Sequence, residues 1–279
     1  LLNEPDAWGL AWEARGGKPG MTGLYLAAMD ALDGIYPFLY VIEGCGQAGL
    51  AKNWGDGIAT DAHLIASRGL SDPNPFFTTL LTKPYGGRVV AGPHIYGPSV
   101  ARTTSDMTGP SFYKRLSQSF GYLNKAGYCP PAGGSCVRFP VLLGETGTGF
   151  LSWDDLQPQM DLAAYAMAGR PGGGPPNPAA DDGLHNPLSG VFWWAWNANG
   201  EGAMGVVRND WTAVDWNKVT WLEHVGLRPW WFGSGVATGP ATGGDGGSVD
   251  STVPVPAPLR VGGRAPVRAG VAPAAANAS

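Results

Sequence analysis

The sequence predicts an α/β fold in which buried, parallel strands alternate with helices. Five short apolar runs are nearly continuous, and each ends in a polar residue or a glycine, which is typical of strands covered on both faces. Segments with helical features follow them in turn, and a repeated strand–helix order builds right-handed βαβ units. The expected strands are Leu1–Asn3, Phe38–Glu43, Arg88–His94, Pro140–Glu145 and Gly190–Trp196.

The helical segments carry their own start and stop features. One begins with Pro110 in a first helical turn and ends near Gly127, and another begins with acidic residues and ends before Gly169. The expected helices are Thr22–Leu32, Asn74–Leu81, Pro110–Lys125, Asp154–Ala168 and Asp215–Val225.

The composition narrows the class of protein. Charged residues make up 14% of the 279-residue chain and hydrophobic residues 44%, so disorder throughout is not expected. The net charge of −4 comes with no basic stripe, so nucleic acid is not expected as a partner. No apolar run approaches the ~18 residues that a membrane helix needs, so no membrane partner is expected.

The two ends of the chain differ. Residues 234–279 contain no aromatic residue, nine glycines and six prolines. Such a stretch cannot bury enough apolar surface to fold. We therefore expect a folded domain at 1–233 and a disordered tail or linker at 234–279.

The cysteines and histidines suggest no metal site. Cys129 and Cys136 bracket a short turn rich in proline and glycine, where a disulfide would suit an oxidising compartment and two free thiols are the alternative. Neither the cysteine spacing nor the four scattered histidines matches a metal-ligand pattern. We expect no metal and no cofactor.

Two architectures fit five strand–helix units, an open doubly wound sheet and part of a (β/α)8 barrel. No glycine-rich phosphate motif follows any strand, which disfavours a nucleotide-binding, doubly wound sheet. In both architectures functional groups gather at the carboxyl ends of the strands. The polar residues expected there are Asn3, Glu4, Glu43, His94, Tyr96 and Glu145, with Trp194 and Trp196 at the end of the last strand.

Glu4 and Glu145 each follow an apolar run. Two carboxylates in one cleft are costly without a purpose, and a facing pair suits glycoside hydrolysis, with one acid/base and one nucleophile. The alternative is that each glutamate is a structural residue in a salt bridge.

Four segments in this order resemble glycoside hydrolase family 5, the cellulase-type retaining enzymes with a (β/α)8 barrel. The segments are Asn3-Glu4-Pro5, His94-Ile95-Tyr96, Gly144-Glu145-Thr146-Gly147 and Phe192-Trp193-Trp194-Ala195-Trp196-Asn197. Two loops agree with the resemblance, 53–57 and 210–212, and it covers roughly 1–233.

The resemblance implies roles for the carboxylates and their neighbours. Glu4 matches the acid/base, and Asn3 matches the residue that bonds the sugar 2-OH. Glu145 matches the nucleophile that forms the glycosyl-enzyme. His94 and Tyr96 match a pair lining the cleavage site. The family's chemistry is independent of metals.

Tryptophans supply the expected substrate contacts. Trp194 matches the family's sugar platform, and Trp54, in a loop on the same face, is expected to contact substrate, because indole faces suit glucose rings. Trp193 is expected to point the other way, into the core. Trp196 fits packing and binding equally. For Glu43 a structural role is favoured over a place in the cleft.

The resemblance also implies an N-terminally truncated barrel, with about five βα units present. The family has three such units before the Asn-Glu-Pro strand, and the chain starts at Leu1 without a visible secretory signal. Exposed strand edges are then expected, together with slower hydrolysis than by a full-length parent.

The expected function is that of a retaining endo-β-1,4-glucanase that cleaves cellulose or a related β-glucan. Its expected partner is the polysaccharide, and it is expected to be a secreted monomer. Two alternatives remain open. The chain could be an inactive paralogue that binds glycan, or the same frame could act on mannan, xyloglucan or β-1,3-glucan.

Overall fold

The computed structural model describes residues 1–47, 50, 53–101, 107–150, 152–170, 177–197, 205–208 and 211–226. The chain divides into two units, Leu1–Gly233 and Ser234–Ser279. The tail expected at 234–279 lies outside the described residues. No helix in the described ranges is both long and apolar enough to cross a bilayer.

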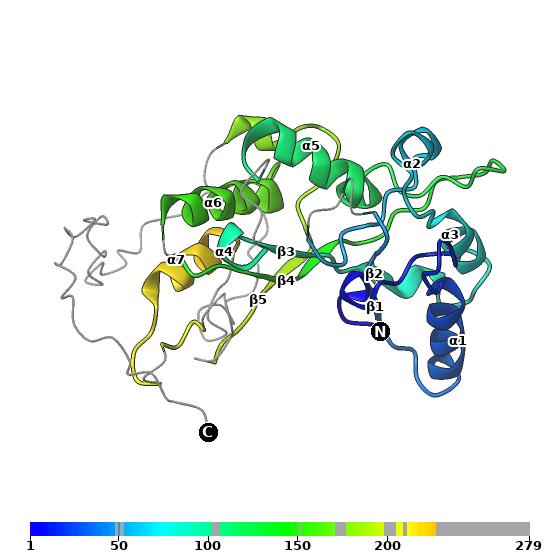
Figure 1. Ribbon diagram of the computed structural model, residues 1–279, viewed down its shortest axis with the longest axis horizontal. Helices are drawn as coiled ribbons and strands as arrows, with labels where there is room; N and C mark the ends of the chain where they lie inside the picture. Colours follow the sequence, from blue (N-terminus) through cyan, green and yellow to red (C-terminus); the bar gives the residue numbers. More distant parts are fainter. Residues whose placement is uncertain are drawn as a thin grey trace, which may run out of the picture. The chain divides into compact units, whose positions relative to one another are not determined.

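The described elements alternate between short strands and helices (Figure 1). The strands are β1 (Tyr40–Ile42), β2 (Val89–Ala91), β3 (His94–Tyr96), β4 (Leu142–Gly147) and β5 (Gly190–Trp193). The α-helices are α1 (Thr22–Asp33), α2 (Ala62–Arg68), α3 (Asn74–Leu80), α4 (Pro98–Ala101), α5 (Gly109–Ser119), α6 (Trp153–Met167) and α7 (Trp216–His224). The 3-10 turns are η1 (Pro5–Trp8), η2 (Gly86–Arg88), η3 (Gly121–Asn124) and η4 (Pro178–Ala180).

All described strand pairs are parallel and follow the order of the chain. β1 pairs with β2, and β3, β4 and β5 pair in that order. A parallel bridge between Ala91 and Val141 joins β2 to the residue before β4. The strand order therefore does not reverse. In a doubly wound sheet it would reverse. Figure 1 shows α5 and α6 over β3, β4 and β5, and α1 and α3 beside β1 and β2.

The single strand expected at Arg88–His94 is wrong, because it is two strands separated by Gly92 and Pro93. Proline has no N–H to give to a ladder. A side chain at Gly92 would place its Cβ 2.4 Å from Val41 Cγ1, so the Val41 side chain fills the space beside this break. The break ends β2 at Ala91 and lets β3 begin with His94.

The strand expected at Leu1–Asn3 is also wrong. The Leu1 amino group donates to the Val41 carbonyl at 3.0 Å, so this segment lies beside β1, but it forms no ladder. Glu4 has a left-handed backbone with φ 48°, and Pro5 opens η1. The chain therefore turns where a strand would have to continue.

The other differences are smaller. The helix expected at Pro110–Lys125 is divided into α5 and η3, where the bare Cα of Gly121 allows close packing against Tyr165. Helices α2 and α4 were not expected; Asp61 caps α2 by accepting from the Leu64 N–H at 2.6 Å. β5 ends at Trp193, before the expected end at Trp196, while α1, α3, α6 and α7 agree with expectation within two residues at each end.

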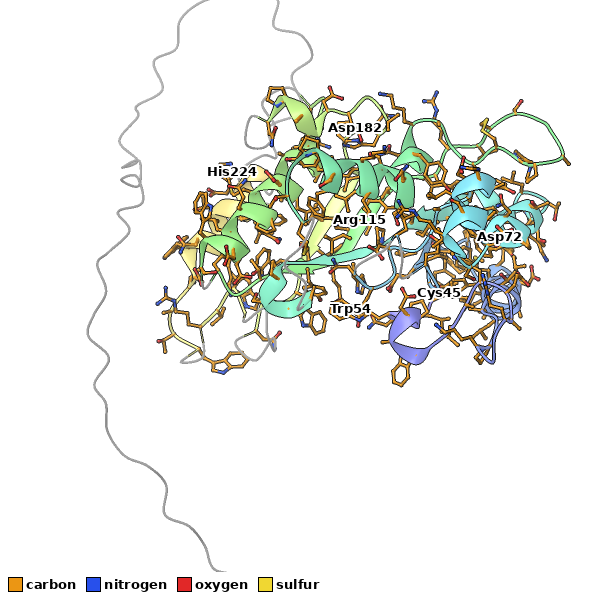
Figure 2. The ribbon with its side chains drawn as sticks, turned by 45° about the horizontal axis from the view of Figure 1, so that its top comes forward. Cys45, Trp54, Asp72, Arg115, Asp182 and His224 are labelled. Atoms are coloured by element: carbon orange, nitrogen blue, oxygen red, sulfur yellow. A yellow bond between two sulfur atoms is a disulfide. The ribbon has the colours of Figure 1, made fainter. Side chains whose placement is uncertain are left out.

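The core is rich in aromatic side chains. Trp12 packs on Phe76 with ring centroids 5.1 Å apart, and Phe77 stacks on Tyr128 at 5.1 Å. These rings join the segment between η1 and α1, helix α3 and the segment after η3. Cys45 is a free, buried cysteine in the same cluster (Figure 2).

Cys129 and Cys136 form a disulfide. It closes the turn between Tyr128 and Val137, which pair as an antiparallel bridge. The structure therefore confirms the disulfide and not two free thiols at these positions.

Candidate active site

Three parallel strands and one turn bring titratable groups to one place. His94 opens β3 and lies opposite Glu145 of β4 in the sheet register. Glu43 follows β1, and Glu4 comes from the turn before η1. Because His94 and Glu145 are opposite each other in parallel strands, their side chains lie close together, and Glu43 and Glu4 reach the same place from outside these two strands.

β4 has an irregularity at the position of its glutamate. Leu143 pairs with Val191 and Thr146 pairs with Trp193, so two residues of β4 stand opposite one residue of β5. Such bulges re-aim side chains next to sites. A side chain at Gly144 would place its Cβ 2.6 Å from the Gly92 carbonyl oxygen, so glycine is needed where β4 passes the break before β3.

His94 lies between the two carboxylates singled out from the sequence. Its Nδ1 lies 3.0 Å from Glu4 Oε1 and 3.3 Å from Glu145 Oε2. An oxygen of Glu4 and an oxygen of Glu145 lie within 4.8 Å of each other. The structure therefore brings together the pair that the sequence predicted to share a cleft.

Tyr96 holds the other side of Glu145. Its hydroxyl donates to Glu145 Oε2, and its backbone N–H donates to Asn53 Oδ1 at 2.7 Å. Burial and the contact with Glu145 raise the pKa of Tyr96 far above its ordinary value, so the hydroxyl stays protonated. The Trp54 ring meets the Tyr96 ring edge-on at 5.8 Å. The loop that carries Asn53 and Trp54 thus lies against the site.

Glu43 joins the cluster from its buried side, with only 6% of its surface exposed. Its Oε2 accepts the Glu4 backbone N–H at 3.0 Å, and its Oε1 lies 3.4 Å from His94 Nε2. Burial raises the pKa of Glu43 to about 7; the charges of Glu4 and Glu145 add to this effect, and His94 opposes it. The structural role favoured from the sequence omitted this contact with His94, although Glu43 directly follows β1.

Burial lowers the pKa of His94, but the carboxylates outweigh it. The hydrogen bond with Glu4 and the charges of Glu43 and Glu145 raise the pKa of His94 above its ordinary value. Both ring nitrogens face carboxylate oxygens, which accept hydrogen bonds when ionised. The arrangement therefore favours the doubly protonated ring.

The turn that carries Glu4 is fixed by Asp6. Asp6 accepts the Gly46 N–H at 2.6 Å and the Gly55 N–H at 3.1 Å. Gly55 has φ 69°, and a Cβ there would lie 2.3 Å from Glu43 Oε2. Only glycine fits between this loop and Glu43, so the loop, the turn and the carboxylate are packed together.

Two predicted site residues lie outside this hydrogen-bonded cluster. Asn3 is exposed, and its side chain has no hydrogen bond to another described residue. Trp194 is 46% exposed, and its backbone N–H donates to the Thr146 carbonyl at 2.8 Å, which places it beside the end of β4. Trp193 packs on the buried Trp221 at 5.2 Å but is itself only half-buried, while Trp196 is 69% exposed.

Glu4, His94 and Glu145 are also the one group of three ligand-type side chains this close together in the described ranges. Their contacts are at hydrogen-bond distance through His94 Nδ1. A protonated ring accounts for the approach, and the geometry requires no cation.

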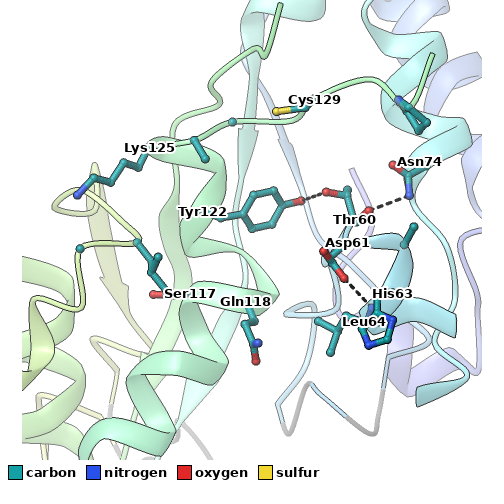
Figure 3. Close-up of a pocket in the computed structure, with 16 residues that line it drawn as sticks. Thr60, Asp61, His63, Leu64, Asn74, Ser117, Gln118, Tyr122, Lys125 and Cys129 are labelled. Atoms are coloured by element: carbon teal, nitrogen blue, oxygen red, sulfur yellow. Dashed lines mark hydrogen bonds between the residues drawn. The ribbon is translucent and has the colours of Figure 1, made fainter. Parts of the chain in front are cut away.

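A cavity of about 910 Å³ lies elsewhere, between the start of α2 and the end of α5 (Figure 3). Thr60 and Tyr122 share a hydrogen bond of 2.7 Å across it, and Asp61, His63 and Lys125 also line it. None of the residues Glu4, Glu43 and Glu145 lines this cavity.

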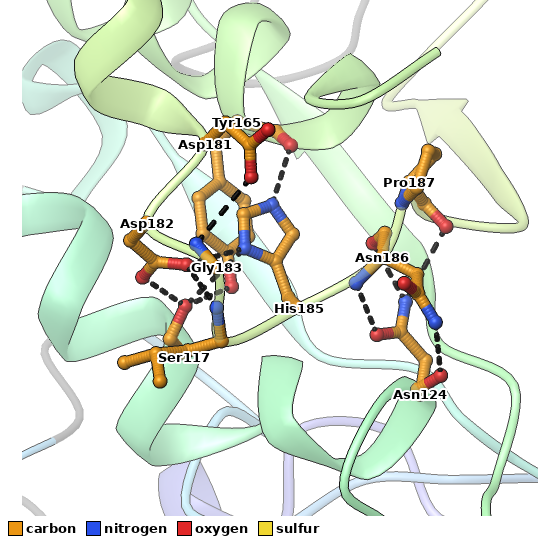
Figure 4. Close-up of polar contacts among 10 residues, drawn as sticks. Ser117, Asn124, Tyr165, Asp181, Asp182, Gly183, His185, Asn186 and Pro187 are labelled. Carbon is orange, nitrogen blue, oxygen red and sulfur yellow. Dashed lines mark hydrogen bonds and ion pairs between the residues drawn. The ribbon is translucent and has the colours of Figure 1, made fainter.

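A second histidine cluster, formed by Ser117, Tyr165, Asp182 and His185, contains the residue types of a hydrolase triad but not the geometry (Figure 4). Ser117 Oγ donates to Asp182 at 2.6 Å, and His185 Nε2 lies 2.9 Å from the Tyr165 carbonyl. Ser117 and His185 are 1% and 3% exposed. The serine is buried and committed to the acid, so this cluster is structural.

No family model matches the sequence, and no curated protein matches it. Solved structures do. The chain is similar to the catalytic domain of the major endoglucanase of Xanthomonas campestris pv. campestris, with a TM-score of 0.51 and 19% identity over 78% of this chain and 53% of that one. It is also similar to a hyperthermophilic endocellulase of the archaeon Pyrococcus horikoshii, with a TM-score of 0.50 and 18% identity over 81% of this chain and 54% of that one.

These likenesses establish the fold. The chain has the fold of about half of an endoglucanase catalytic domain, since it spans 53% and 54% of those two proteins. A cellulase–inhibitor complex matches over the same share, with a TM-score of 0.50 and 18% identity.

Proposed function

We propose that this chain carries the cleavage site of a retaining glycoside hydrolase that acts on β-glucan, most specifically an endo-β-1,4-glucanase. One observation carries the proposal: oxygens of Glu4 and Glu145 lie within 4.8 Å of each other. Retaining glycosidases hold their carboxyl groups about 5–5.5 Å apart, whereas inverting enzymes leave about 6.5–9.5 Å for a water. The spacing supports the retaining class.

Double displacement assigns each carboxylate a role. Glu145 attacks the anomeric carbon and forms a glycosyl ester, while Glu4 gives its proton to the departing glycosidic oxygen. A water then gives its proton to Glu4 and attacks the same carbon, which breaks the ester and returns Glu145 as a carboxylate. The sugar leaves with its original anomeric configuration.

Tyr96 and His94 support the nucleophile in this scheme. Tyr96 donates a hydrogen bond to Glu145 Oε2. The protonated ring of His94 lies 3.3 Å from the same carboxylate and offers a positive charge beside it. The two groups also fix the direction in which the attacking oxygen points.

Substrate binding is assigned to tryptophans and to Asn3. Trp194 is exposed next to the end of β4, and Trp54 lies against Tyr96. Flat indole faces bind sugar rings with little loss of conformational entropy. An endocellulase with a matching fold (TM-score 0.50) was solved with cellotetraose. We also propose that the substrate is a β-glucan polysaccharide and that Asn3 forms a hydrogen bond with the 2-OH of the bound sugar.

The proposed function also implies an architecture for the folded domain and a location for the protein. The parallel strands, each paired with the next along the chain, are assigned to the wall of a (β/α)8 barrel. The Cys129–Cys136 disulfide supports an oxidising compartment and therefore secretion. The protein is assigned as a monomer.

The test is hydrolysis of carboxymethyl-cellulose and cellotetraose by the 279-residue chain, beside its Glu145→Ala variant. Reducing ends released by the unaltered chain and not by the variant support the proposal. Binding of cellotetraose without any release would instead favour a glycan-binding protein. Parallel reactions with mannan and β-1,3-glucan separate the substrate classes.

A further inference from the structure

We propose that Glu43 is a positioning residue of the cleavage site: its single carboxylate orients the His94 ring through one oxygen and anchors the Glu4 backbone through the other. The contacts are 3.4 Å from Oε1 to His94 Nε2 and 3.0 Å from the Glu4 N–H to Oε2. Its kinetic consequences rest on the function proposed above. The orientation itself does not.

Glu43 is built rigidly into the fold. The Tyr25 hydroxyl accepts the Glu43 backbone N–H at 3.1 Å and donates to the Glu43 carbonyl at 3.0 Å. Tyr25 is fully buried, and Gly55 leaves no room above the carboxylate. A side chain fixed at both its backbone and its head group loses little entropy when it holds a neighbour. This is the property that a positioning residue needs.

The groups facing His94 come from four parts of the chain. Glu43 faces Nε2, Glu4 and Glu145 face Nδ1, and the Tyr96 ring stands edge-on at 6.5 Å. A carboxylate on Nε2 holds a proton there, so the Nδ1–H is directed at the two reacting carboxylates. Without Glu43 the ring loses the contact that fixes which nitrogen faces them.

Glu43 also acts on the turn that carries Glu4. Glu4 has a left-handed backbone with φ 48°, a conformation that side-chain-bearing residues rarely adopt without support. The N–H of this residue is bound by Glu43. One carboxylate thus couples the position of the acid/base to the orientation of the ring beside it.

Two variants separate the two contacts. Glu43→Gln keeps an oxygen for the Glu4 N–H but presents an amide NH₂ to His94 Nε2, so the ring must carry its proton on Nδ1 alone. Glu43→Ala removes both contacts. The matched control is Asp161→Asn, because Asp161 is buried to a similar degree, accepts the Gly109 N–H at 2.8 Å and lies outside the cluster.

The experiment is a pH titration of the His94 ring by ¹⁵N NMR in the full 279-residue chain, with the resonance assigned by its loss in His94→Gln. We expect the pKa of His94 to fall in Glu43→Gln, because the carboxylate that stabilises the charged ring is gone, and Nε2 to show an unprotonated shift at neutral pH. Asp161→Asn should titrate like the unaltered chain. An unchanged His94 titration in Glu43→Gln would overturn the proposal.

Kinetics supply the second readout. For cellotetraose, kcat should fall about a hundredfold in Glu43→Ala, with KM unchanged, because small displacements of reacting groups cost about that much and only 6% of the Glu43 surface is exposed. A rise in KM at constant kcat would contradict a positioning role. If the unaltered chain cleaves nothing, the glycosidase proposal fails, while the NMR titration still decides the role of Glu43.

Discussion

The two buried histidines of this protein lie in opposite kinds of polar cluster. His185 has one nitrogen on a backbone carbonyl and the other within 3.0 Å of a single carboxylate, Asp182, and its ring stacks on Tyr165 at 3.7 Å. His94 faces three carboxylates and no backbone carbonyl. The first cluster pairs every group within the protein. The second concentrates negative charge that the fold alone does not require.

This difference separates a structural cluster from a chemical one. Burying one carboxylate beside a histidine and a hydroxyl yields a stable, neutralised network. Bringing three carboxylates around one ring costs desolvation and repulsion that a more economical core would avoid. Proteins keep such arrangements at functional sites, where perturbed groups are needed. The comparison supports the assignment of the site to His94 and its neighbours, although both clusters contain a histidine, a hydroxyl and an acid.

The largest expected effect is the loss of turnover in Glu145→Ala. Removing a nucleophile costs at least about a thousandfold in kcat. Added azide should restore turnover, and the glycosyl azide should have the inverted anomeric configuration because it forms in one displacement. A retained configuration would rule out Glu145 as the nucleophile. In contrast, Ser117→Ala in the structural cluster should hydrolyse at the unaltered rate, measured as reducing ends released.

The Tyr96 hydroxyl should matter less than the nucleophile but more than any group near His185. Tyr96→Phe removes the hydrogen bond to Glu145 and should lower kcat about ten- to a hundredfold. A rise in KM with kcat unchanged would show that Tyr96 positions sugar instead.

The structural cluster should contribute to stability and not to turnover. His185→Ala removes a fully buried ring that bonds Asp182 and the Tyr165 carbonyl and stacks on Tyr165. We expect a loss of about 3 kcal/mol in the free energy of unfolding, measured by urea titration. His94→Ala should lower stability in a way that depends on pH, because it leaves the carboxyl groups of Glu4, Glu43 and Glu145 without the ring that lies between them. An equal loss in His94→Ala at acidic and at neutral pH would contradict the contrast between the two clusters.

The two clusters should also respond to pH in opposite directions. Burial raises the pKa of Asp182, but hydrogen bonds from Ser117 and the Leu184 N–H hold it below the ordinary 3.8. Its contribution to stability is therefore present above pH 3.8 and is lost as the pH falls below that value. Asp182→Asn should flatten this acidic decline in urea titrations at stepped pH.

For Glu43 the sign is reversed. Its pKa rises from 4.5 to about 7, so the folded state binds a proton that the unfolded state has released between these values. Stability should fall as the pH rises from 4.5 to about 7. His94, whose pKa is also raised, should add to the fall above its ordinary value of 6.5. A Glu43→Gln chain that keeps the full decline would contradict the coupling.

Much of the fold could be predicted from the sequence. Continuous apolar runs predict β1, β4 and β5, and periodic segments with proline or acidic starts predict α1, α3, α6 and α7. The ends of the strands were less predictable. Whether Leu1–Asn3 pairs depends on the left-handed turn at Glu4, and the division of Arg88–His94 depends on how closely Gly92 approaches Val41. The first is not a property of the local sequence, whereas Gly92 and Pro93 mark the second in the sequence itself.

The residues of the site were more predictable from the sequence than the contacts between them. The rule that functional groups follow parallel strands selected Glu4, Glu145, His94 and Tyr96, which the structure brings together. It could not assign Glu43, because its two contacts come from segments 39 and 51 residues away along the chain. Long-range contacts of this kind require the folded chain.

The most direct test of the central claim is the stereochemistry of cleavage, followed by ¹H NMR as the 279-residue chain acts on cellotetraose. A pair of carboxylates this close should act by double displacement. Double displacement predicts that the β-anomer accumulates first and that the α-anomer forms later, as the new reducing ends equilibrate in solution. Initial formation of the α-anomer would show that water attacks the sugar directly, and it would contradict the assignment of Glu145 as the nucleophile.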